Sequence, residues 1–250
     1  MPVDQPPIDY ERRTLRGWGR RLVRRIVLTA LWLLFRVRIK HPEKTPKSGG
    51  VLAVANHLHN ADPIIVNAAF PRPLHFMAKK EVFSVGVVAY LIRLVGTFPV
   101  DRGKADRTAI RNAQARLAQG IAVGIFPEGT RSTTRSLQKA HPGVGLLALS
   151  GVPVQPMTVT GSERMPFNGS RAKDAAHLPW PDSGQTGVRV LFGEPFTVPK
   201  AIGARRVTAE EATEIIMIEL ARLLPPDYRG FYADILANET TCRSLPFTPR

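Results

Sequence analysis

His57 and Asp62 form a pair that could carry out acid–base chemistry. Both lie in a short polar stretch between a continuous apolar run at 51–55, which predicts a buried strand, and a helix predicted at 63–70. On one straight helix, residues five positions apart would point about 140° away from each other, but a strand-to-helix turn can fold Asp62 back onto the His57 imidazole. A carboxylate placed there fixes the tautomer and stabilises the imidazolium that forms when the histidine takes a proton. The spacing therefore suits a general base with an orienting partner.

Two other interpretations of this stretch remain open from the residues alone. Because Asp62 precedes Pro63, it is well placed as an ordinary helix N-cap, and His57 would then be only a loop residue. Alternatively, His57, His59 and Asp62 could bind a metal ion, as in the His-x-His-x-Asp-His loop of metallo-hydrolases. Here, however, the aspartate comes one position late and Pro63 follows it instead of histidine. The remaining histidines form no ligand-spaced pair, so we expect no metal site.

Two arginines follow later predicted strands. Arg102 comes after the strand expected at 96–100, and Arg131 comes after the strand expected at 121–126. Open α/β sheets bind ligands at the carboxyl ends of their strands. A guanidinium matches the geometry of phosphate oxygens, and Gly129 lets a ligand approach the backbone closely. Each arginine could therefore bind an anionic group, although each taken alone is more typical of a surface ion pair.

A sheet is needed to position these residues, and the chain after residue 48 predicts one. Short apolar runs alternate with helical patterns, which is typical of an α/β domain with a mixed, mainly parallel sheet flanked by helices. Strands are expected at 51–55, 74–78, 96–100, 121–126, 152–160 and 188–192, and helices at 63–70, 105–119, 143–150 and 208–224. Thr208 and Glu211 form a capping box at the start of the last helix. The Pro- and Gly-rich stretch at 161–187 is expected to be a long loop.

The net charge of +15, from 35 Lys+Arg against 20 Asp+Glu, is concentrated near the N-terminus. Residues 12–40 contain ten Lys or Arg and no Asp or Glu, with an apolar run at 26–35. As a helix this run is about 15 Å long, half of the ~30 Å hydrocarbon core of a bilayer, so it is too short to cross a membrane. A basic amphipathic helix that contains tryptophans favours an anionic lipid surface. The alternatives are a core-packed helix with outward arginines and a signal peptide, although no small residues suited to cleavage follow.

The composition limits the remaining classes of protein. The sequence has no finger, helix-turn-helix or aromatic-rich sheet motif, so no nucleic-acid partner is expected despite the charge. The single cysteine, Cys242, excludes an intramolecular disulfide and indicates a reducing compartment. At 44% hydrophobic and 22% charged, the chain has the composition of a globular protein. We expect an N-terminal membrane-interface helical segment at 1–47, a catalytic domain at 48–230 and a C-terminal tail at 231–250.

Four ordered blocks resemble the motifs of the glycerolipid acyltransferase family, which includes 1-acylglycerol-3-phosphate acyltransferases. The blocks are Asn56-His-Leu-His-Asn-Ala-Asp62, Gly96 to Arg102, Phe126-Pro-Glu-Gly-Thr-Arg-Ser132 and Val152-Pro-Val-Gln-Pro156. The third block is the specific one, and residues 139–143 are similar to a Lys/Gly-containing loop of the family. Two positions depart from the pattern, because His59 stands where the family often has Ser and Gln155 interrupts an apolar block.

The resemblance implies a role for each site residue. His57 would be the catalytic base and Asp62 its orienting partner. The residues that would bind the phosphate-bearing acceptor are Arg102, Glu128, Gly129, Thr130 and Arg131. Two further candidate site residues are His59, which could share the role of base, and Lys139.

The implied activity is transfer of a fatty acyl group from a thioester, acyl-CoA or acyl carrier protein, to the hydroxyl of 1-acylglycerol 3-phosphate. The product would be phosphatidic acid for phospholipid biosynthesis, and no cofactor is expected. The sequence lacks a Ser or Cys nucleophile elbow, which agrees with direct transfer. The alternatives are acylation of glycerol 3-phosphate or of another lipid or glycolipid hydroxyl, a non-catalytic lipid-surface protein and a metal-dependent hydrolase. The expected location is peripheral, on the cytoplasmic face of a membrane.

Overall fold

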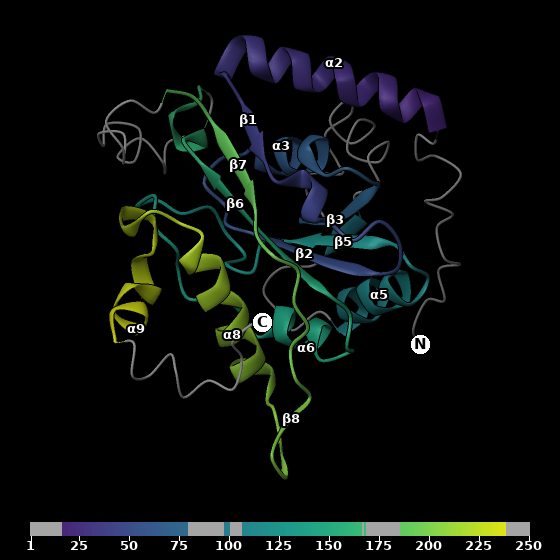
Figure 1. Ribbon diagram of the computed structural model, residues 1–250, viewed down its shortest axis with the longest axis vertical. Helices are drawn as coiled ribbons and strands as arrows, with labels where there is room; N and C mark the ends of the chain where they lie inside the picture. The colour runs from purple at the N-terminus through teal and green to yellow at the C-terminus, as the bar shows by residue number, and fades with distance from the viewer. Residues whose placement is uncertain (1–16, 80–97, 101–106, 167, 169–185, 239–250) are drawn as a thin grey trace.

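A seven-stranded mixed sheet forms the centre of the molecule, with strand order β1-β7-β6-β2-β5-β3-β4 (Figure 1). The computed structural model describes residues 17–79, 98–100, 107–166, 168 and 186–238. The strands are β1 (Arg38–Lys40), β2 (Val51–Ala55), β3 (Leu74–Lys79), β4 (Phe98–Val100), β5 (Ala122–Ile125), β6 (Val154–Thr160) and β7 (Arg189–Phe192). All neighbouring strands are parallel except β6 and β7, which are antiparallel. The predicted mixed, mainly parallel sheet is therefore confirmed.

The central strand β2 shows why the sheet forms where the apolar runs lie. All five of its residues are buried, and it pairs with β5 on one side and β6 on the other. Leu52 and Val54 belong to the hydrophobic core on one face of the sheet, whereas Val51, Ala53 and Ala55 belong to the core on the opposite face. A strand covered on both faces needs a continuous apolar run, not an alternating one.

Helices cover both faces of the sheet (Figure 1). The helices α2 and α3 contribute to the core that contains Val51, and α5, α6 and α8 contribute to the core that contains Leu52. The bounds are α2 (Gly17–Phe35), α3 (Asp62–Ala69), α5 (Arg107–Ala118), α6 (Gly143–Ala148), α8 (Ala209–Arg222) and α9 (Ala233–Ala237). A short hairpin, β8 (Ala201–Ile202) and β9 (Arg205–Arg206), precedes α8. Single turns of 3₁₀ helix occur at 42–44, 162–164, 226–228 and 230–232.

The predicted helix starts and strand positions agree with these bounds to within a few residues. At the start of α8, Thr208 Oγ1 accepts a hydrogen bond from the amide of Glu211 at 3.2 Å, and the Glu211 carboxylate accepts one from the amide of Thr208 at 2.9 Å. The capping box is therefore confirmed. Part of the loop predicted at 161–187 and the whole tail after residue 238 lie outside the described residues.

The packed domain extends beyond the predicted limits of residues 48 and 230. Strand β1 lies within the segment predicted as a separate N-terminal part, yet it pairs with β7 and forms one edge of the sheet. At the other end, Tyr232 is 3% exposed and belongs to the core under α8. Neither contact could be read from a local pattern, because a three-residue strand and a single aromatic anchor carry little periodicity.

The N-terminal helix α2 has apolar residues on two sides. Leu31, with Val27, Leu28 and Phe35, packs against the core shared with α3. The other side exposes Trp18, Leu22, Ile26, Trp32, Leu33 and Leu34, which we call the outer apolar face of α2. Within the part of the chain that the structure describes, no helix is both long and apolar enough to cross a bilayer.

Candidate active site

Asn56 fixes the direction in which the chain leaves β2. Its side-chain amide donates to the Val159 carbonyl at 2.8 Å, and its side-chain oxygen accepts from the Val159 amide at 2.8 Å. Backbone pairing between β2 and β6 ends at Ala55 and Met157, so the Asn56 side chain continues the ladder beyond the last strand residue. The residues that follow therefore leave the sheet from a defined position.

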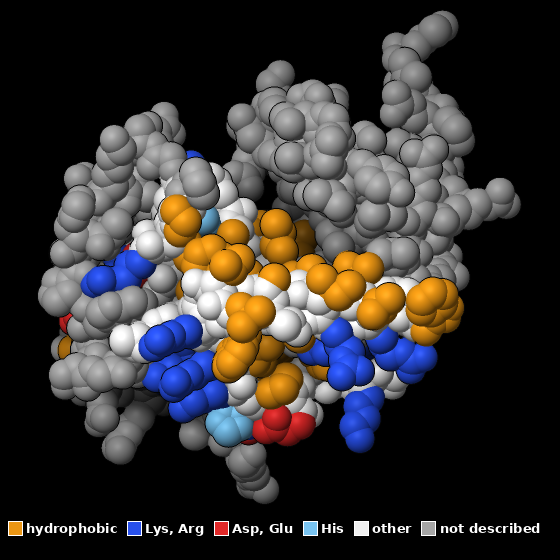
Figure 2. All heavy atoms as spheres, turned by 90° about the horizontal axis from the view of Figure 1, so that it is seen from above, with side chains coloured by type: hydrophobic (Ala, Val, Ile, Leu, Met, Phe, Trp, Pro, Cys, Tyr) orange, Lys and Arg blue, Asp and Glu red, His pale blue; other side chains and the backbone are white. Residues whose placement is uncertain are grey.

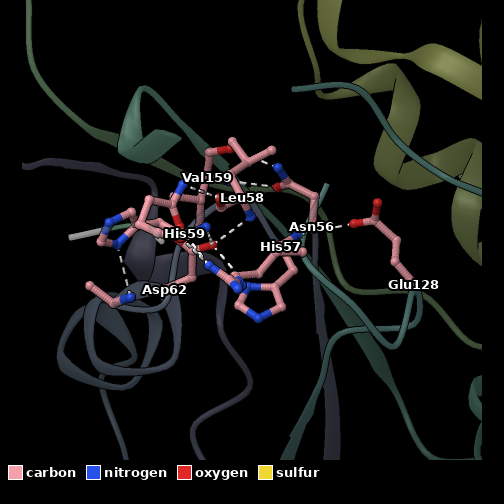
Figure 3. Close-up of polar contacts among 10 residues, drawn as sticks. Asn56, His57, Leu58, His59, Asp62, Glu128 and Val159 are labelled. Atoms are coloured by element: carbon pink, nitrogen blue, oxygen red, sulfur yellow. Dashed lines mark hydrogen bonds and ion pairs between the residues drawn. The ribbon is translucent and has the colours of Figure 1, made fainter. Parts of the chain in front are cut away.

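The carboxylate of Asp62 gathers the loop 57–59 around itself (Figure 3). One oxygen, Oδ2, accepts hydrogen bonds from His57 Nδ1 at 3.0 Å, from the Leu58 amide at 2.6 Å and from the His59 amide at 2.6 Å. Asp62 is fully buried. It does not act as the N-cap considered above, because the N-cap is Ala61 and Asp62 is the first residue of α3. The carboxylate turns back to the loop, where three donors meet it.

This contact fixes the tautomer of His57. A carboxylate can only accept, so Nδ1 carries the proton and Nε2 has the lone pair that can receive another. The His57 side chain is only 10% exposed, which limits competition from bulk water. The base and orienting partner expected from the sequence therefore lie in hydrogen-bonding contact, at the carboxyl end of β2.

His59 has both ring nitrogens engaged. The Ala61 amide donates to Nδ1 at 3.0 Å, and Nε2 donates to the Pro166 carbonyl at 3.1 Å. Burial lowers the pKa of His59, which favours the neutral ring. To act as a base, His59 would have to give up a hydrogen bond that holds the loop, so its geometry supports a structural part.

Glu128 braces the backbone of His57. Its Oε1 accepts from the His57 amide at 3.0 Å and its Oε2 from the Gln138 amide at 2.9 Å. Glu128 is 3% exposed, and burial raises the pKa of its carboxyl to about 7. The Ser132 amide donates to the His57 carbonyl at 2.8 Å, so residues 126–132 hold the His57 backbone at both its N–H and its C=O. Both oxygens of Glu128 thus face backbone donors, and the acceptor-binding role implied for it stays a prediction.

Arg131 lies beside the same loop, half-buried. Its Nη1 donates to the backbone and side-chain oxygens of Asn168, the latter at 3.1 Å, and the Asn168 side-chain amide donates to the Leu58 carbonyl at 2.9 Å. Asn168 therefore couples Arg131 to the loop that carries His57. The remaining N–H groups of the guanidinium can serve an anion.

The remaining candidate site residues are Gly129, Thr130, Lys139 and Arg102. Gly129 has a φ of +69°, and a Cβ there would lie 2.8 Å from the His141 ring, so this position requires glycine. Thr130 and Lys139 are exposed. Arg102 lies outside the described residues.

The sequence did not single out Asn56, Ser132 or Asn168 as site residues. Asn56 lies in the first of the four sequence blocks and Ser132 in the third, so these blocks already indicated that both positions matter. Asn168 carried no local signal, because its partner Leu58 is 110 residues away.

A metal site finds no support among the described residues, where no three His, Cys, Asp or Glu side chains cluster in a way that could hold an ion. His57 and His59 point to different partners, Asp62 and the Pro166 carbonyl, and so do not converge. A buried carboxylate, an oriented histidine and an arginine follow the carboxyl ends of β2 and β5, an arrangement that suits proton transfer beside an anionic group.

The comparisons with known proteins agree with this class of centre. Residues 36–160 match the model of the Acyltransferase family, and the chain belongs to that family. A probable 1-acyl-sn-glycerol-3-phosphate acyltransferase of Mycoplasma pneumoniae is 35% identical over 135 residues, which are 51% of this chain and 50% of that protein. A lyso-ornithine lipid O-acyltransferase of Pseudomonas aeruginosa is 33% identical over 136 residues, 52% of either chain. The chain thus spans about half the length of these curated relatives.

The fold is also that of a solved acyltransferase. The crystal structure of the 1-acyl-sn-glycerophosphate (LPA) acyltransferase PlsC from Thermotoga maritima superposes with a TM-score of 0.58. The match covers 83% of this chain and 82% of that one, at 24% identity. The matched family region contains His57, Asp62, Glu128 and Arg131.

Proposed function

We propose that this protein transfers a fatty acyl group from an acyl thioester, acyl-CoA or acyl carrier protein, to the hydroxyl of 1-acylglycerol 3-phosphate, forming phosphatidic acid. The observation that carries the proposal is the hydrogen bond from His57 Nδ1 to the buried Asp62 carboxylate at 3.0 Å. It lies within the region that matches the Acyltransferase family. The proposed reaction needs no cofactor and no metal ion.

In the proposed step His57 Nε2 takes the proton of the acceptor hydroxyl as its oxygen bonds to the thioester carbonyl carbon. The bond from that carbon to sulfur then breaks, and the thiolate leaves with the electron pair and receives the proton from the imidazolium. Asp62 holds the imidazole and stabilises its positive charge while the proton resides there. No acyl-enzyme is needed.

The acceptor phosphate is assigned to Arg131 and Arg102. Arg131 lies next to Leu58 through Asn168, so its guanidinium is held close to the base loop. A guanidinium binds a phosphate through paired, charge-assisted hydrogen bonds. Gly129 would let the head group approach the backbone. Glu128 is assigned to holding His57.

A second acceptor is considered because of the lyso-ornithine lipid O-acyltransferase relative. By its name, that relative acylates a different lysolipid, and it is 33% identical to this chain over 136 residues. The proposed acceptor carries a phosphate that Arg131 would bind, whereas another lipid hydroxyl would not require this arginine for recognition.

An acceptor panel with one acyl-CoA donor tests the function, with thiol release as the measurement. We expect turnover with 1-acylglycerol 3-phosphate, little with glycerol 3-phosphate or lyso-ornithine lipid, and no effect of a chelator. Chelator-sensitive thioester hydrolysis, or vesicle binding without turnover, would contradict the proposal.

The matched variants His57→Ala and His59→Gln separate the two histidines. Loss of a positioned base should lower kcat by about 10²- to 10⁴-fold in His57→Ala. Glutamine at 59 can still donate to the Pro166 carbonyl, so kcat should change less than about threefold, because no base is lost. The reverse result, an active His57→Ala and an inactive His59→Gln, would transfer the base assignment to His59.

The membrane surface is the partner we propose for α2. Figure 2 shows hydrophobic side chains gathered in a band on the face seen from above, where α2 lies, with Lys and Arg beside it. The outer apolar face of α2 includes Trp18 at 75% and Leu34 at 72% exposed. An amphipathic helix of this kind binds in the plane of an anionic lipid surface. We place the protein at the cytoplasmic face, as a peripheral protein, because its proposed thioester donors and its single cysteine, which cannot form an intramolecular disulfide, suit that compartment.

Vesicle sedimentation tests this placement. Binding to vesicles containing phosphatidylglycerol should weaken as salt screens the arginines. The double variant Leu33→Ser and Leu34→Ser should bind less, and Leu146→Ser on α6 serves as its control because Leu146 is 47% exposed outside α2. Equal binding of the wild type, the double variant and Leu146→Ser, or binding that salt does not weaken, would exclude an anionic membrane surface as the partner of α2.

A further inference from the structure

Three aromatic rings form a column that ends on the imidazole of His57. The His57 and Phe126 rings are stacked with centroids 4.3 Å apart and planes inclined by 19°. Phe126 in turn stacks on Phe76, with centroids 5.1 Å apart and the same inclination of 19°. Phe126 is 8% and Phe76 2% exposed, so little water reaches this side of the imidazole.

Small residues on β5 and β2 leave space for the column of aromatic rings. Phe76 on β3 pairs with Gly124 on β5, and Gly124 pairs with Ala53 on β2. A Cβ added at Gly124 would lie 2.7 Å from the Phe76 ring, so only glycine lets the ring lie across β5. Phe126 follows two positions after Gly124, and both Ala53 and Ala55 belong to the same core as the two phenylalanines. The column is therefore supported from inside the sheet.

The imidazole is thus in contact with two different electrostatic partners. Asp62 lies at its edge, on Nδ1, and Phe126 lies against its ring face. The face of an aromatic ring carries negative charge density, which attracts a cation placed over it. His57 becomes a cation only after it has taken the acceptor proton, so this attraction is stronger in the reacting state than in the resting state.

We infer that Phe126 is a positioning residue that stabilises the protonated form of His57 through its π face, with Gly124 and Phe76 holding its ring in place. The inference rests on the proposed role of His57 as the base. Because Nδ1 is hydrogen-bonded to Asp62, Nε2 is the nitrogen through which His57 can exchange a proton. This predicts that the rate depends on the charge distribution of the ring at position 126 and not only on the size of the ring.

Graded fluorination of Phe126 in the full-length protein tests the inference, because fluorine weakens the negative charge density of the ring while nearly preserving its shape. With one, two, three and five fluorines at position 126, log kcat should fall steadily, by about 2- to 30-fold over the series, with KM for the acceptor little changed. The same series at Phe70 is the control, because Phe70 is a buried phenylalanine of the same core whose ring packs in a tilted arrangement against Phe192, with centroids 6.1 Å apart. A flat series at 126, or equal slopes at 126 and 70, would overturn the inference.

A second measurement does not depend on turnover. The ring current of Phe126 should shift the His57 Hε1 proton upfield in NMR spectra, and Phe126→Leu should remove this shift. Gly124→Ala should reduce it, because the new methyl displaces Phe76. An unshifted wild-type proton would overturn the inference. The inference and the proposed acceptor can fail separately. If the His57 Hε1 proton is shifted and kcat falls along the fluorination series, but turnover needs an acceptor other than 1-acylglycerol 3-phosphate, the inference stands and the proposed acceptor is wrong.

Discussion

Replacement of Asp62 by Asn tests the charge that supports the base directly. An asparagine oxygen at the Oδ2 position can still accept from the Leu58 and His59 amides, which both lie 2.6 Å from Oδ2, and from His57 Nδ1, so the loop should keep its shape. The side chain is neutral, however, so the negative charge beside the imidazole is lost. The imidazolium that forms when His57 takes the acceptor proton is then no longer stabilised by a carboxylate.

The magnitude follows from the geometry of the pair. At an effective dielectric constant of about 20, a carboxylate and an imidazolium 3.0 Å apart attract by about 5 kcal/mol. About 1.4 kcal/mol corresponds to a tenfold change in rate, so kcat should fall by about 10³- to 10⁴-fold. KM for the acceptor should change little, because Asp62 is fully buried and does not contact it.

Thiol release under saturating acyl-CoA and 1-acylglycerol 3-phosphate is the assay, and circular dichroism confirms that the variant is folded. Glu194→Gln is the matched control, because Glu194 pairs with Lys44 at 2.7 Å but is 67% exposed and lies after β7. Its kcat should equal that of the wild type. A folded Asp62→Asn protein with kcat within tenfold of the wild type would refute the assignment of His57 as a base whose protonated form is stabilised by the Asp62 charge.

Two further predictions concern stability. Because burial raises the pKa of the Glu128 carboxyl from 4.5 to about 7, the folded state keeps a proton that the unfolded state has lost; the free energy of unfolding should therefore fall by about 3 kcal/mol as the pH rises from about 4.5 to about 7. Urea titrations should show this fall in the wild type and a flatter profile in Glu128→Gln; parallel profiles would contradict it. Thr208→Ala removes the side-chain acceptor for the Glu211 amide and should cost about 1 kcal/mol, or about 2–4 °C in Tm by calorimetry, with kcat unchanged. An unchanged Tm would mean that the capping box contributes nothing.

The elements of the fold could be predicted because their causes are local. Val51 to Ala55 is apolar throughout because β2 is covered on both faces, and the box at Thr208 and Glu211 involves residues three apart. Strand β1 could not be predicted, because its only support is pairing with β7, about 150 residues later.

The candidate site could be predicted in part, for the same reason. The contact between His57 and Asp62 spans five residues and was expected. The hydrogen bond from the His57 amide to Glu128 spans 71 residues, so the motif showed that Glu128 matters without showing that it holds backbone. The hydrogen bond from His59 to the Pro166 carbonyl joins residues 107 apart. It favours His57 over His59 as the base, which the spacing of the two histidines from Asp62 did not decide.

The short helix α3 links two parts of the molecule that have been described separately. It begins at Asp62, and at its other end Arg24 of α2 donates to the Ala69 carbonyl at 3.3 Å while Arg20 donates to the Arg72 carbonyl just beyond. Two of the basic side chains of α2, both half-buried, therefore contact the protein. Eight helical residues span about 12 Å and bend little. In the proposed membrane-bound state, α3 would therefore join the helix that rests on the lipid to the carboxylate that contacts His57, so the base would be held at a fixed distance from the surface that supplies its acceptor.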